Sequence, residues 1–394
     1  MSHKIVIVGG GASGFMAAIQ AARNGASVTI LEQNGKFGRK LQSTGNGKCN
    51  LTNLEQNCSC YRSSTPEFAG KVLSRFDVHQ TVRFFTDIGI YTKNKNGYLY
   101  PHSEQASSVM EVLEMEARNL KIKRKTQEKV LKIRKTNEGF LVATKTWEYP
   151  CDRVILACGS KASAIEGADG SGYRLASDLG HTIVKPMPAL TGIKGTGRFY
   201  TKWAGVRTGA CVTLVINGLP LKQECGEVQL TDYGISGIPV FQLSRYAARA
   251  LYEKCTVSMY LDFLPEFDPE GLLTFLKERR AHNPYKTLRE SLIGLFPDKL
   301  IDVLMIDTKT EEQLAEKIKK LEVPVKETMS FEHAQVCSGG VDLKEINSET
   351  MESRLVSGIY FCGELLDVDG ACGGYNLQWA WSSGALAGIS AARS

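Results

Sequence analysis

A chain of 394 residues is long enough for two or three domains and can bury a substantial core without stabilisation by disulfides or bound metal ions. Its apolar fraction of 43% and charged fraction of 23% are ordinary for a soluble protein, and a formal net charge of +6 is modest for this length. The basic residues are spread along the chain apart from residues 121–125, a run more typical of a solvated strand face than of a nucleic-acid-binding patch.

The N-terminal segment has only part of the pattern of an export signal. Lys4 precedes an apolar run, but glycines between residues 9 and 14 interrupt the continuous apolar helix that a signal peptide or a membrane span needs. We therefore expect a cytoplasmic protein without a nucleic-acid or membrane partner, whose eleven cysteines are mostly reduced thiols. There is no Cys-x-x-Cys, and Cys58-Ser59-Cys60 has no matching cysteine pair or histidine cluster, so we expect neither a redox disulfide nor a metal site.

The N-terminal stretch has the order of a dinucleotide-binding βαβ unit. A β-branched run at residues 5–8 leads into Gly9-Gly10-Gly11-Ala12-Ser13-Gly14, an alanine-rich segment follows at residues 15–24, and a second apolar run at residues 28–31 ends at Glu32. In such a unit the first glycine (Gly9) permits a tight turn, the second (Gly11) lets the backbone approach a pyrophosphate at the helix N-terminus, and the third (Gly14) lets helix and strand pack closely. Glu32 is placed to accept hydrogen bonds from a ribose, which favours FAD or NAD over NADP. The alternative is a βαβ turn with a purely structural role.

The polar, glycine-rich stretch at residues 38–53 follows this acid directly. An ordered loop dense in donors at this place can run alongside the rest of a long dinucleotide, and Lys40 and Lys48 are candidate partners of a phosphate or a flavin carbonyl. The alternative is a flexible surface loop.

The segment up to residue 189 alternates helical and strand patterns. We expect helical packing over residues 68–88, a hairpin over 91–101, a helix over 103–120, paired strands at 129–134 and 140–146, a buried strand over 153–159, and a helix from 170 to 179 that Gly180 terminates. The small residues at the end of the 153–159 strand, Ala157 and Gly159 among them, would let the chain pass close to a cofactor.

The sequence pattern changes at residue 190. Residues 206–216 and the turn Asn217-Gly218 predict antiparallel strands, and residues 272–280, 287–296 and 311–320 predict amphipathic helices with prolines between them. We interpret residues 190–345 as an inserted module. The glycines of residues 192–197 do not follow a clear strand, so we interpret them as a loop and not as a second nucleotide-binding unit.

The C-terminal segment carries a second set of cofactor-type features. A strand at residues 357–364 ends in Gly363-Glu364, and a turn at residues 372–375 opens a helix of small and aromatic residues over 376–391. If both chain ends converge on one cofactor, Glu364 or Asp369 would hold a ribityl chain and the amides around residues 374–377 would face the pyrimidine edge of an isoalloxazine. The alternative is an alanine- and glycine-rich packing helix, which leaves the Gly-Glu turn unexplained.

These motifs resemble those of a bacterial family of FAD-dependent oxidoreductases that includes aminoacetone oxidases and 3-dehydro-bile-acid Δ4,6-reductases. The resemblance covers nearly the whole chain and is carried by residues 9–14 with Glu32, by residues 44–53, by 234–237 with 242–244, by 339–341, and most specifically by 363–370 and 373–380. Some positions depart from the family pattern, with Lys48 and Tyr98 in place of arginines, Asp232-Tyr233 in place of a Thr-His type pair, and Cys337 in place of a threonine. The substrate is therefore not carried over from the family.

The resemblance implies an α/β fold in which a Rossmann-like FAD-binding domain is interrupted by a β-barrel-like part and a helical part. We accordingly expect the FAD-binding domain at residues 1–189 and 346–394, an inserted β-rich domain at 190–262 and 328–345, and an inserted helical domain at 263–327. The resemblance also implies non-covalent FAD. The expected cofactor-binding residues are Gly9, Gly11, Ala12, Ser13, Gly14, Glu32, Gln33, Lys40, Thr44, Gly45, Asn50, Thr52, Val130, Ala157, Gly159, Gly363, Glu364, Asp369, Gly374, Tyr375, Asn376 and Leu377.

Three functions remain open. We favour a reductase in which NAD(P)H, bound transiently, reduces the flavin and hydride then passes to an activated C=C of an enone-type substrate such as a 3-oxo-steroid or bile-acid-like compound. The alternatives are an oxidase of a small amine, which uses O2, and a non-enzymatic FAD-binding or sensor protein. A reductase also needs a proton donor, for which Tyr375, His102 and Tyr233 are candidates by chemistry alone. The oligomeric state stays open.

Overall fold

The structure, a computed structural model that describes residues 2–393, divides into two compact units. Unit 1 runs from the N-terminal end to Pro186 and from Val336 to the C-terminal end, and unit 2 is Met187–Gln335. Residues 336–345, which the sequence assigned to the inserted β-rich domain, therefore lie in unit 1. The chain leaves unit 1 in β12 (Ile183–Ala189) and returns in β19 (Val336–Val341), and these two strands form a sheet. The predicted separation of the inserted module into a β-rich and a helical domain stays a prediction.

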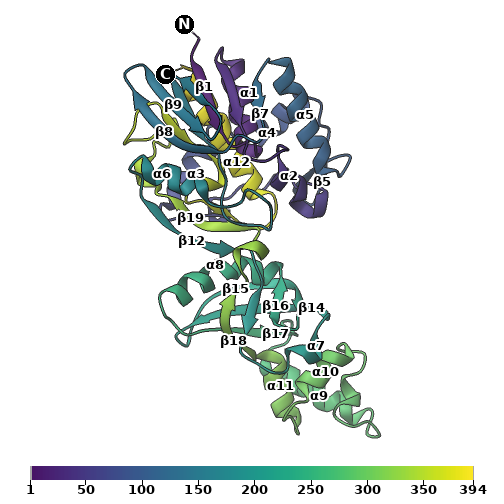
Figure 1. The fold of residues 1–394 in the computed structure, drawn as a ribbon. Helices are drawn as coiled ribbons and strands as arrows, with labels where there is room; N and C mark the ends of the chain where they lie inside the picture. Colours follow the sequence, from purple (N-terminus) through teal and green to yellow (C-terminus); the bar gives the residue numbers. More distant parts are fainter. Residues whose placement is uncertain (1, 394) are drawn as a thin grey trace. The chain divides into compact units, whose positions relative to one another are not determined.

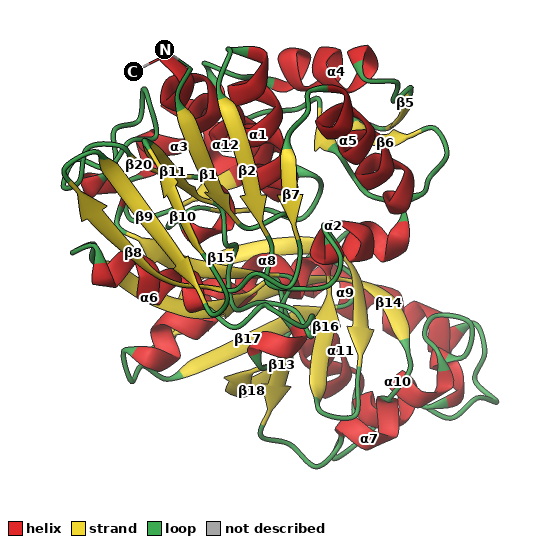
Figure 2. Ribbon diagram, turned by 45° about the horizontal axis from the view of Figure 1, so that its top comes forward, coloured by secondary structure: helices red, strands yellow, loops and turns green. Residues whose placement is uncertain are grey.

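Unit 1 is built on a five-stranded parallel sheet, seen side by side in Figure 2, with the order β20-β11-β1-β2-β7. The strands are β1 (Lys4–Val8), β2 (Ser27–Leu31), β7 (Lys123–Lys125), β11 (Arg153–Leu156) and β20 (Ile359–Phe361). The apolar runs of β1, β11 and β20 are almost fully buried, as expected for parallel strands that are covered on both faces. Because β20 comes from the C-terminal segment, the prediction that the two chain ends share one Rossmann-like domain is confirmed.

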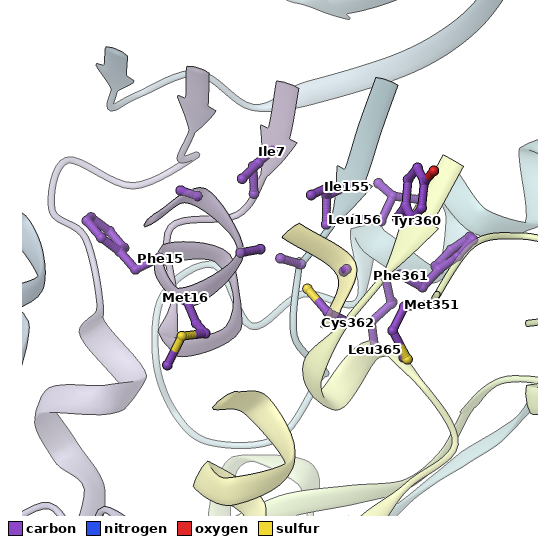
Figure 3. Packing of buried hydrophobic residues seen from close by; sticks show 14 of the residues in the cluster. Ile7, Phe15, Met16, Ile155, Leu156, Met351, Tyr360, Phe361, Cys362 and Leu365 are labelled. Atoms are coloured by element: carbon purple, nitrogen blue, oxygen red, sulfur yellow. The ribbon is translucent and has the colours of Figure 1, made fainter. Parts of the chain in front are cut away.

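Two helices from opposite ends of the chain pack face to face in unit 1. α1 (Ala12–Arg23) follows β1, and α12 (Tyr375–Arg393) ends the chain beside it in Figure 1. A Cβ added to Gly384 would lie 2.5 Å from the Ser13 carbonyl oxygen, and one added to Gly388 would lie 2.2 Å from that of Ala17. Only glycine therefore lets the two backbones approach this closely. Figure 3 shows the apolar core around α1, with Ile7 of β1, Phe15 of α1 and Phe361 of β20 among its members.

The remaining strands and α-helices of unit 1 agree with most of the sequence patterns, although Arg39–Ser43 is a helix where a loop was expected. They are α2 (Arg39–Ser43), β3 (Thr52–Asn53), β4 (Tyr61–Arg62), α3 (Pro66–Leu73), α4 (Val78–Asp87), β5 (Thr92–Lys95), β6 (Tyr98–Pro101), α5 (Ala106–Asn119), β8 (Val130–Thr136), β9 (Gly139–Thr144), β10 (Glu148–Cys151), α6 (Ser171–Asp178) and β21 (Asp369–Gly370), with a short 3-10 helix at Thr44–Gly47. β5 and β6 form the predicted hairpin, and β3 pairs with β6.

Unit 2 contains a closed six-stranded barrel, which confirms the predicted barrel-like part. Its strands, in the order of their pairing, are β13 (Ile193–Gly195), β16 (Gly234–Gly237), β15 (Leu219–Leu230), β14 (Arg207–Ile216), β17 (Val257–Asp262) and β18 (Leu321–Thr328). The helices are α7 (Tyr200–Trp203), α8 (Ile238–Tyr252), α9 (Pro269–Ala281), α10 (Asp298–Leu304) and α11 (Glu311–Lys319).

The helix predicted over residues 287–296 is wrong. Only Glu290–Leu292 forms a short 3-10 helix there, and Gly294 then takes a positive φ of +84° that ends it. The Arg279 guanidinium satisfies the carbonyls of Ser291 and Ile293, which a helix would have satisfied internally. The regular helix α10 starts only after Pro297, and α8 was not predicted.

Nine cysteines are free thiols, which agrees with the expectation that most are reduced, and one pair forms a disulfide. Cys211 of β14 and Cys225 of β15 stand directly opposite each other in the antiparallel register and are joined by a disulfide. Among residues 2–393, no group of three histidine, cysteine, aspartate or glutamate side chains could hold a metal ion, and no helix is long and apolar enough to cross a membrane.

Candidate functional site

The glycine loop between β1 and α1 has the geometry that its spacing predicts. Gly9 adopts a φ of +109°, and a Cβ there would lie 2.4 Å from the Ala157 carbonyl oxygen at the end of β11. A Cβ on Gly14 would lie 2.0 Å from the Gly9 carbonyl oxygen. The first and third glycines are thus required by the protein's own packing, at the turn and at the contact between helix and strand.

Gly11, between them, faces open space. A Cβ built there would meet no atom of residues 2–393 within 4 Å apart from its chain neighbours, and its extended backbone (φ −92°, ψ −165°) suits any residue. Gly11 is also the N-cap of α1, and no side chain among the described residues caps this helix. The absence of a side chain therefore leaves room for a ligand at the positive end of the helix dipole, and the pyrophosphate of FAD fits this place.

Glu32 directly follows β2, and its carboxylate contacts the glycine loop. Its carboxylate accepts hydrogen bonds from the backbone N–H of Gly10 and of Asn34, both at 2.9 Å, and its side chain is buried. Each carboxylate oxygen has a second lone pair, so the anchored group can still accept hydrogen bonds from ribose hydroxyls.

Glu32→Ala is expected to weaken FAD binding by about 10- to 100-fold, because it removes the ribose acceptor and leaves two amides without their charged partner, at about 1.5–3 kcal/mol for each such hydrogen bond. Glu32→Gln should have a smaller effect, since its amide oxygen still accepts one bond. Titration of apoprotein with FAD, followed by flavin fluorescence, measures both. Glu138→Ala, at an exposed position before β9, is the control. Equal affinities for all three variants would contradict the role of Glu32.

The C-terminal turn meets the polar loop at residues 44–53. In the amide orientation that satisfies its partners, Asn50 accepts a hydrogen bond from the Gly374 N–H at 3.2 Å and donates to the Thr52 carbonyl at 2.9 Å. Thr52 donates to Gln378 of α12 at 2.5 Å, and Asn53 donates to the Gly373 carbonyl at 3.1 Å. The loop is therefore ordered against the start of α12.

Gly363 brings the C-terminal segment to the glycine loop as well. Its φ is +72°, and a Cβ there would lie 2.4 Å from the Ser13 hydroxyl. Its N–H donates to Ser383, and the indole N–H of Trp379 donates to its carbonyl, both at 2.9 Å. α12 starts about nine residues before its contact with Ser13, or roughly 14 Å of helix. Such a spacing suits an extended dinucleotide that reaches from the glycine loop to the turn at residues 373–376.

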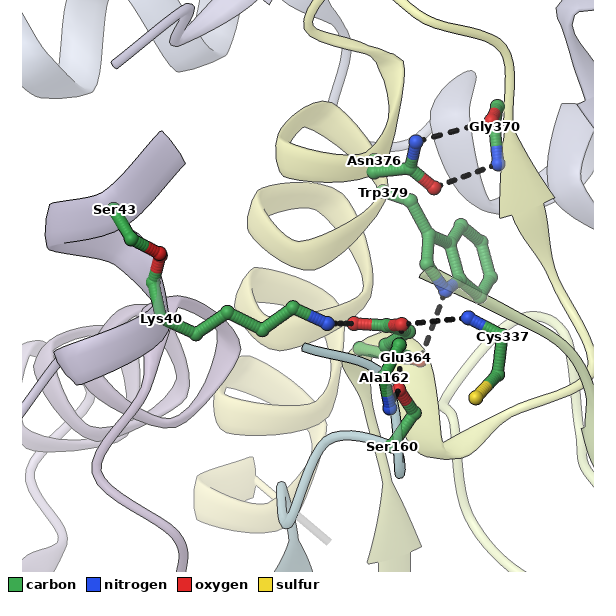
Figure 4. Close-up of polar contacts among 10 residues, drawn as sticks. Lys40, Ser43, Ser160, Ala162, Cys337, Glu364, Gly370, Asn376 and Trp379 are labelled. Carbon is green, nitrogen blue, oxygen red and sulfur yellow. Dashed lines mark hydrogen bonds and ion pairs between the residues drawn. The ribbon is translucent and has the colours of Figure 1, made fainter. Parts of the chain in front are cut away.

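The carboxylate of Glu364 is the centre of a half-buried network, shown in Figure 4. The Lys40 ammonium lies 2.6 Å from Glu364 Oε2, while Glu364 Oε1 accepts hydrogen bonds from the Ser160 hydroxyl at 2.6 Å and the Cys337 N–H at 3.0 Å. Lys40 and Glu364, both expected at the cofactor, are thus in contact. Ser160 and Cys337 were not expected there, although Ser160 directly follows the predicted Gly159.

The other expected cofactor residues of the C-terminal segment have structural partners. The Asn376 amide exchanges hydrogen bonds with the Gly370 N–H and carbonyl at 2.8 and 3.0 Å (Figure 4), which fixes the turn before α12. Asp369 is fully buried and lies opposite Arg62 in the pairing of β21 with β4. Leu377 is half-buried against the core.

The remaining expected residues lie within unit 1 at several places. Thr44 donates a hydrogen bond to the Leu41 carbonyl, and Gln33 donates one to the Gly167 carbonyl. Gly45 and Gly159 have positive φ angles of +56° and +68°, and there is open space where a Cβ of Gly159 would stand. Val130 is buried at the start of β8. Their contact with FAD stays a prediction.

The three candidate proton donors lie in different surroundings. Tyr375 is buried, with its ring edge-on to Tyr61 at 5.8 Å and its hydroxyl beside the Cys60 thiol. His102 is exposed beyond β6, where its ring lies 5.6 Å from that of Tyr91. Tyr233 belongs to unit 2, next to Gly192. Tyr375 alone of the three belongs to the turn that Asn50 contacts.

Comparison with known proteins agrees with this geometry. Residues 3–390 match the family model described as "HI0933-like protein Rossmann domain". The chain is 45% identical, over 99% of both chains, to a 3-dehydro-bile acid delta(4,6)-reductase of Clostridium scindens, and 31% identical, over 98% of both, to a ribosomal RNA dihydrouridine synthase of Haemophilus influenzae.

A solved structure supports the fold. The 3-ketosteroid-delta4-(5alpha)-dehydrogenase of Rhodococcus jostii RHA1 superimposes with a TM-score of 0.50 at 14% identity, and the match covers 100% of this chain and 97% of the other. With a family model that spans nearly the whole chain and full-length enzyme relatives, the chain belongs to the HI0933-like family and is a FAD-dependent oxidoreductase.

Proposed function

We propose that this enzyme reduces a C=C bond conjugated to a carbonyl in an enone-type, 3-oxo-steroid or bile-acid-like substrate, with NAD(P)H as the electron donor. Bound FAD would accept hydride from the nicotinamide and deliver it to the β-carbon of the enone. The single observation that carries the proposal is the 45% identity, over 99% of both chains, to the Clostridium scindens bile-acid reductase. The 31% identical relative is named for dihydrouridine, which is uridine hydrogenated at its C5=C6 bond, so both names denote the same class of reduction.

The residues of unit 1 supply binding and orientation in this proposal. Amides at the start of α1 would hold the pyrophosphate, Glu32 the adenosine ribose, Glu364 the ribityl chain, and the turn at residues 373–376 the pyrimidine edge. Ile193–Gly195 forms strand β13, so the interpretation of residues 192–197 as a loop is wrong for these three residues. Because β13 pairs antiparallel with β16 and β18, unlike the parallel first strand of a Rossmann unit, it supports the view that the nicotinamide binds transiently and without a Rossmann unit of its own.

Tyr375 is the proton donor that we favour. Burial raises the pKa of its hydroxyl above the ordinary value, and the Cys60 thiol beside it raises the pKa further, so the group carries its proton at neutral pH. Hydride addition at the β-carbon of an enone must be matched by a proton at the α-carbon or the oxygen, which a protonated hydroxyl can supply.

Tyr375→Phe is expected to lower kcat by about 10²-fold, because it removes the acid while keeping the ring contact with Tyr61. FAD affinity and the rate of flavin reduction by NAD(P)H should not change, which separates proton delivery from cofactor binding. His102→Phe serves as the comparison. If His102→Phe lowered kcat and Tyr375→Phe did not, His102 and not Tyr375 would be the proton donor.

The proposed function is tested by anaerobic flavin absorbance. Bleaching of the enzyme-bound flavin by NADH or NADPH, followed by reoxidation with a 4-en-3-one steroid, is the expected result. Bleaching by a small amine, with reoxidation by O2 alone, would instead support the oxidase. A flavin that neither donor reduces would support a sensor. If uridine-containing RNA reoxidised the flavin and no steroid did, the substrate would be a nucleic acid and not a steroid.

A further inference from the structure

One face of the β5–β6 hairpin gathers positive charge around a single carboxylate. The Nζ atoms of Lys95, Lys93 and Lys48 lie 2.7, 3.0 and 3.7 Å from the oxygens of Glu104, and the lysines come from β5 and from the polar loop. The lysine side chains are 40–55% exposed. One carboxylate balances one of three ammonium groups, so the cluster keeps a net positive charge.

Two tyrosines give the same face an apolar surface. In the hairpin register Lys95 stands opposite Tyr98 and Lys93 opposite Tyr100, so all four side chains project to one side. Lys95 Nζ lies 5.3 Å from the centre of the Tyr100 ring, and Tyr98 is 40% exposed. We call Lys48, Lys93, Lys95, Tyr98 and Tyr100 the lysine–tyrosine face.

This face borders the turn that we assign to the flavin. A Cβ on Gly373 would lie 2.6 Å from the Tyr98 ring, and Asn53, which stands opposite Tyr98 in the pairing of β3 with β6, donates to the Gly373 carbonyl. All of these residues belong to unit 1. The lysine–tyrosine face is therefore continuous with the start of α12.

Ordinary surface ion pairing does not account for the arrangement. Exposed pairs contribute little, and three ammonium groups around one carboxylate repel one another. Glu104 reaches them from a backbone with a φ of +52°, which non-glycine residues rarely adopt. Hydrogen bonds from Lys95 and Lys93 lower the pKa of Glu104 to about 2, so it is a permanent anion near neutral pH. The cluster thus already binds one carboxylate and has charge left for a second.

We propose that the lysine–tyrosine face binds the carboxylate at the far end of the substrate, while the tyrosine rings contact its apolar body. This inference rests on the proposed function, since it specifies the enone substrate as an amphipathic acid. The anionic end is held by Lys93 and Lys95, and the uncharged enone end reaches the flavin side of the turn.

The test compares a 4-en-3-one steroid acid with its methyl ester in wild type and in the double variant Lys93→Gln/Lys95→Gln. Loss of two exposed charge contacts should raise KM for the acid by about 10-fold, leave KM for the ester and kcat for both unchanged, and remove the salt dependence of the acid's KM. Lys132→Gln/Lys135→Gln, which changes two exposed lysines of β8, is the matched control and should behave as wild type.

Equilibrium dialysis of the acid and the ester against the oxidised holoenzyme provides a readout that does not depend on turnover. Preferential binding of the acid that the Lys93→Gln/Lys95→Gln variant loses would support the proposal even if no enone were reduced, in which case the proposed function fails alone. Equal losses for acid and ester, or no loss for either, would overturn the inference. NADPH, NADH and a uridine-containing RNA fragment are dialysed in the same way. If the Lys93→Gln/Lys95→Gln variant lost affinity only for NADPH relative to NADH, or only for the RNA fragment, the inference would also be overturned, because the lysines would then bind the anion of another ligand.

Discussion

Gly11→Val is expected to abolish FAD binding while the protein still folds. A valine side chain meets no described atom within 4 Å at its Cβ, and its backbone conformation is allowed, but it projects into the space that the pyrophosphate needs at the start of α1. We expect FAD affinity to fall at least about 100-fold, equivalent to about 2.7 kcal/mol, because close approach of the phosphates to the helix amides is lost. Fluorescence titration gives the affinity, and thermal unfolding of the FAD-free protein gives the stability, which should match wild type.

Gly14→Ala provides the contrast with Gly11→Val. Its Cβ would lie 2.0 Å from the Gly9 carbonyl oxygen, so this variant should lose stability even without FAD. If Gly11→Val bound FAD as tightly as wild type, or if it unfolded as Gly14→Ala is expected to, the glycine loop would not be the pyrophosphate site.

Gly388→Val is expected to have the largest effect on stability. Its side chain would start 2.2 Å from the Ala17 carbonyl oxygen, and this backbone atom of α1 cannot move without separating α1 from α12. We expect a loss of about 3–5 kcal/mol in the free energy of unfolding, and a fall in Tm of about 10 °C in FAD-free protein. Differential scanning calorimetry measures both quantities.

Gly209→Ala is the control for Gly388→Val, because a Cβ on this β14 glycine meets no described atom within 4 Å and its φ is not positive. It should unfold as wild type does. A Gly388→Val protein with unchanged Tm would show that the two helices are not held at the distance that the structure gives them.

The parts of the site that could be predicted are those fixed by short spacing in the sequence. The spacing of strand, glycine loop and helix predicts the tight turn at Gly9 and the close packing at Gly14, and both are found in the structure, while the contact of Gly11 with a pyrophosphate stays a prediction. The position of Glu32 directly after the next strand could be predicted in the same way, while its contact with a ribose stays a prediction. The Gly363-Glu364 turn could be recognised for the same reason, since it follows a buried strand and precedes a glycine-led helix.

The parts that could not be predicted depend on distant or register contacts. The hydrogen bond from Ser160 to Glu364 joins residues that are 204 positions apart in the sequence, and no local sequence pattern predicts such a contact. Cys211 and Cys225 meet only because β14 and β15 pair in one register, which a shift of one residue would remove. Residues 287–296 have helical periodicity, but Gly294 and the Arg279 guanidinium favour an irregular turn.

The central claim is that the two ends of the chain form one FAD site. The most direct test is to denature purified protein, quantify the released flavin, and then titrate the flavin-free protein with FAD. We predict a yellow protein that releases one FAD per chain and takes up one on reconstitution. A colourless protein that releases no flavin and does not bind added FAD would contradict it.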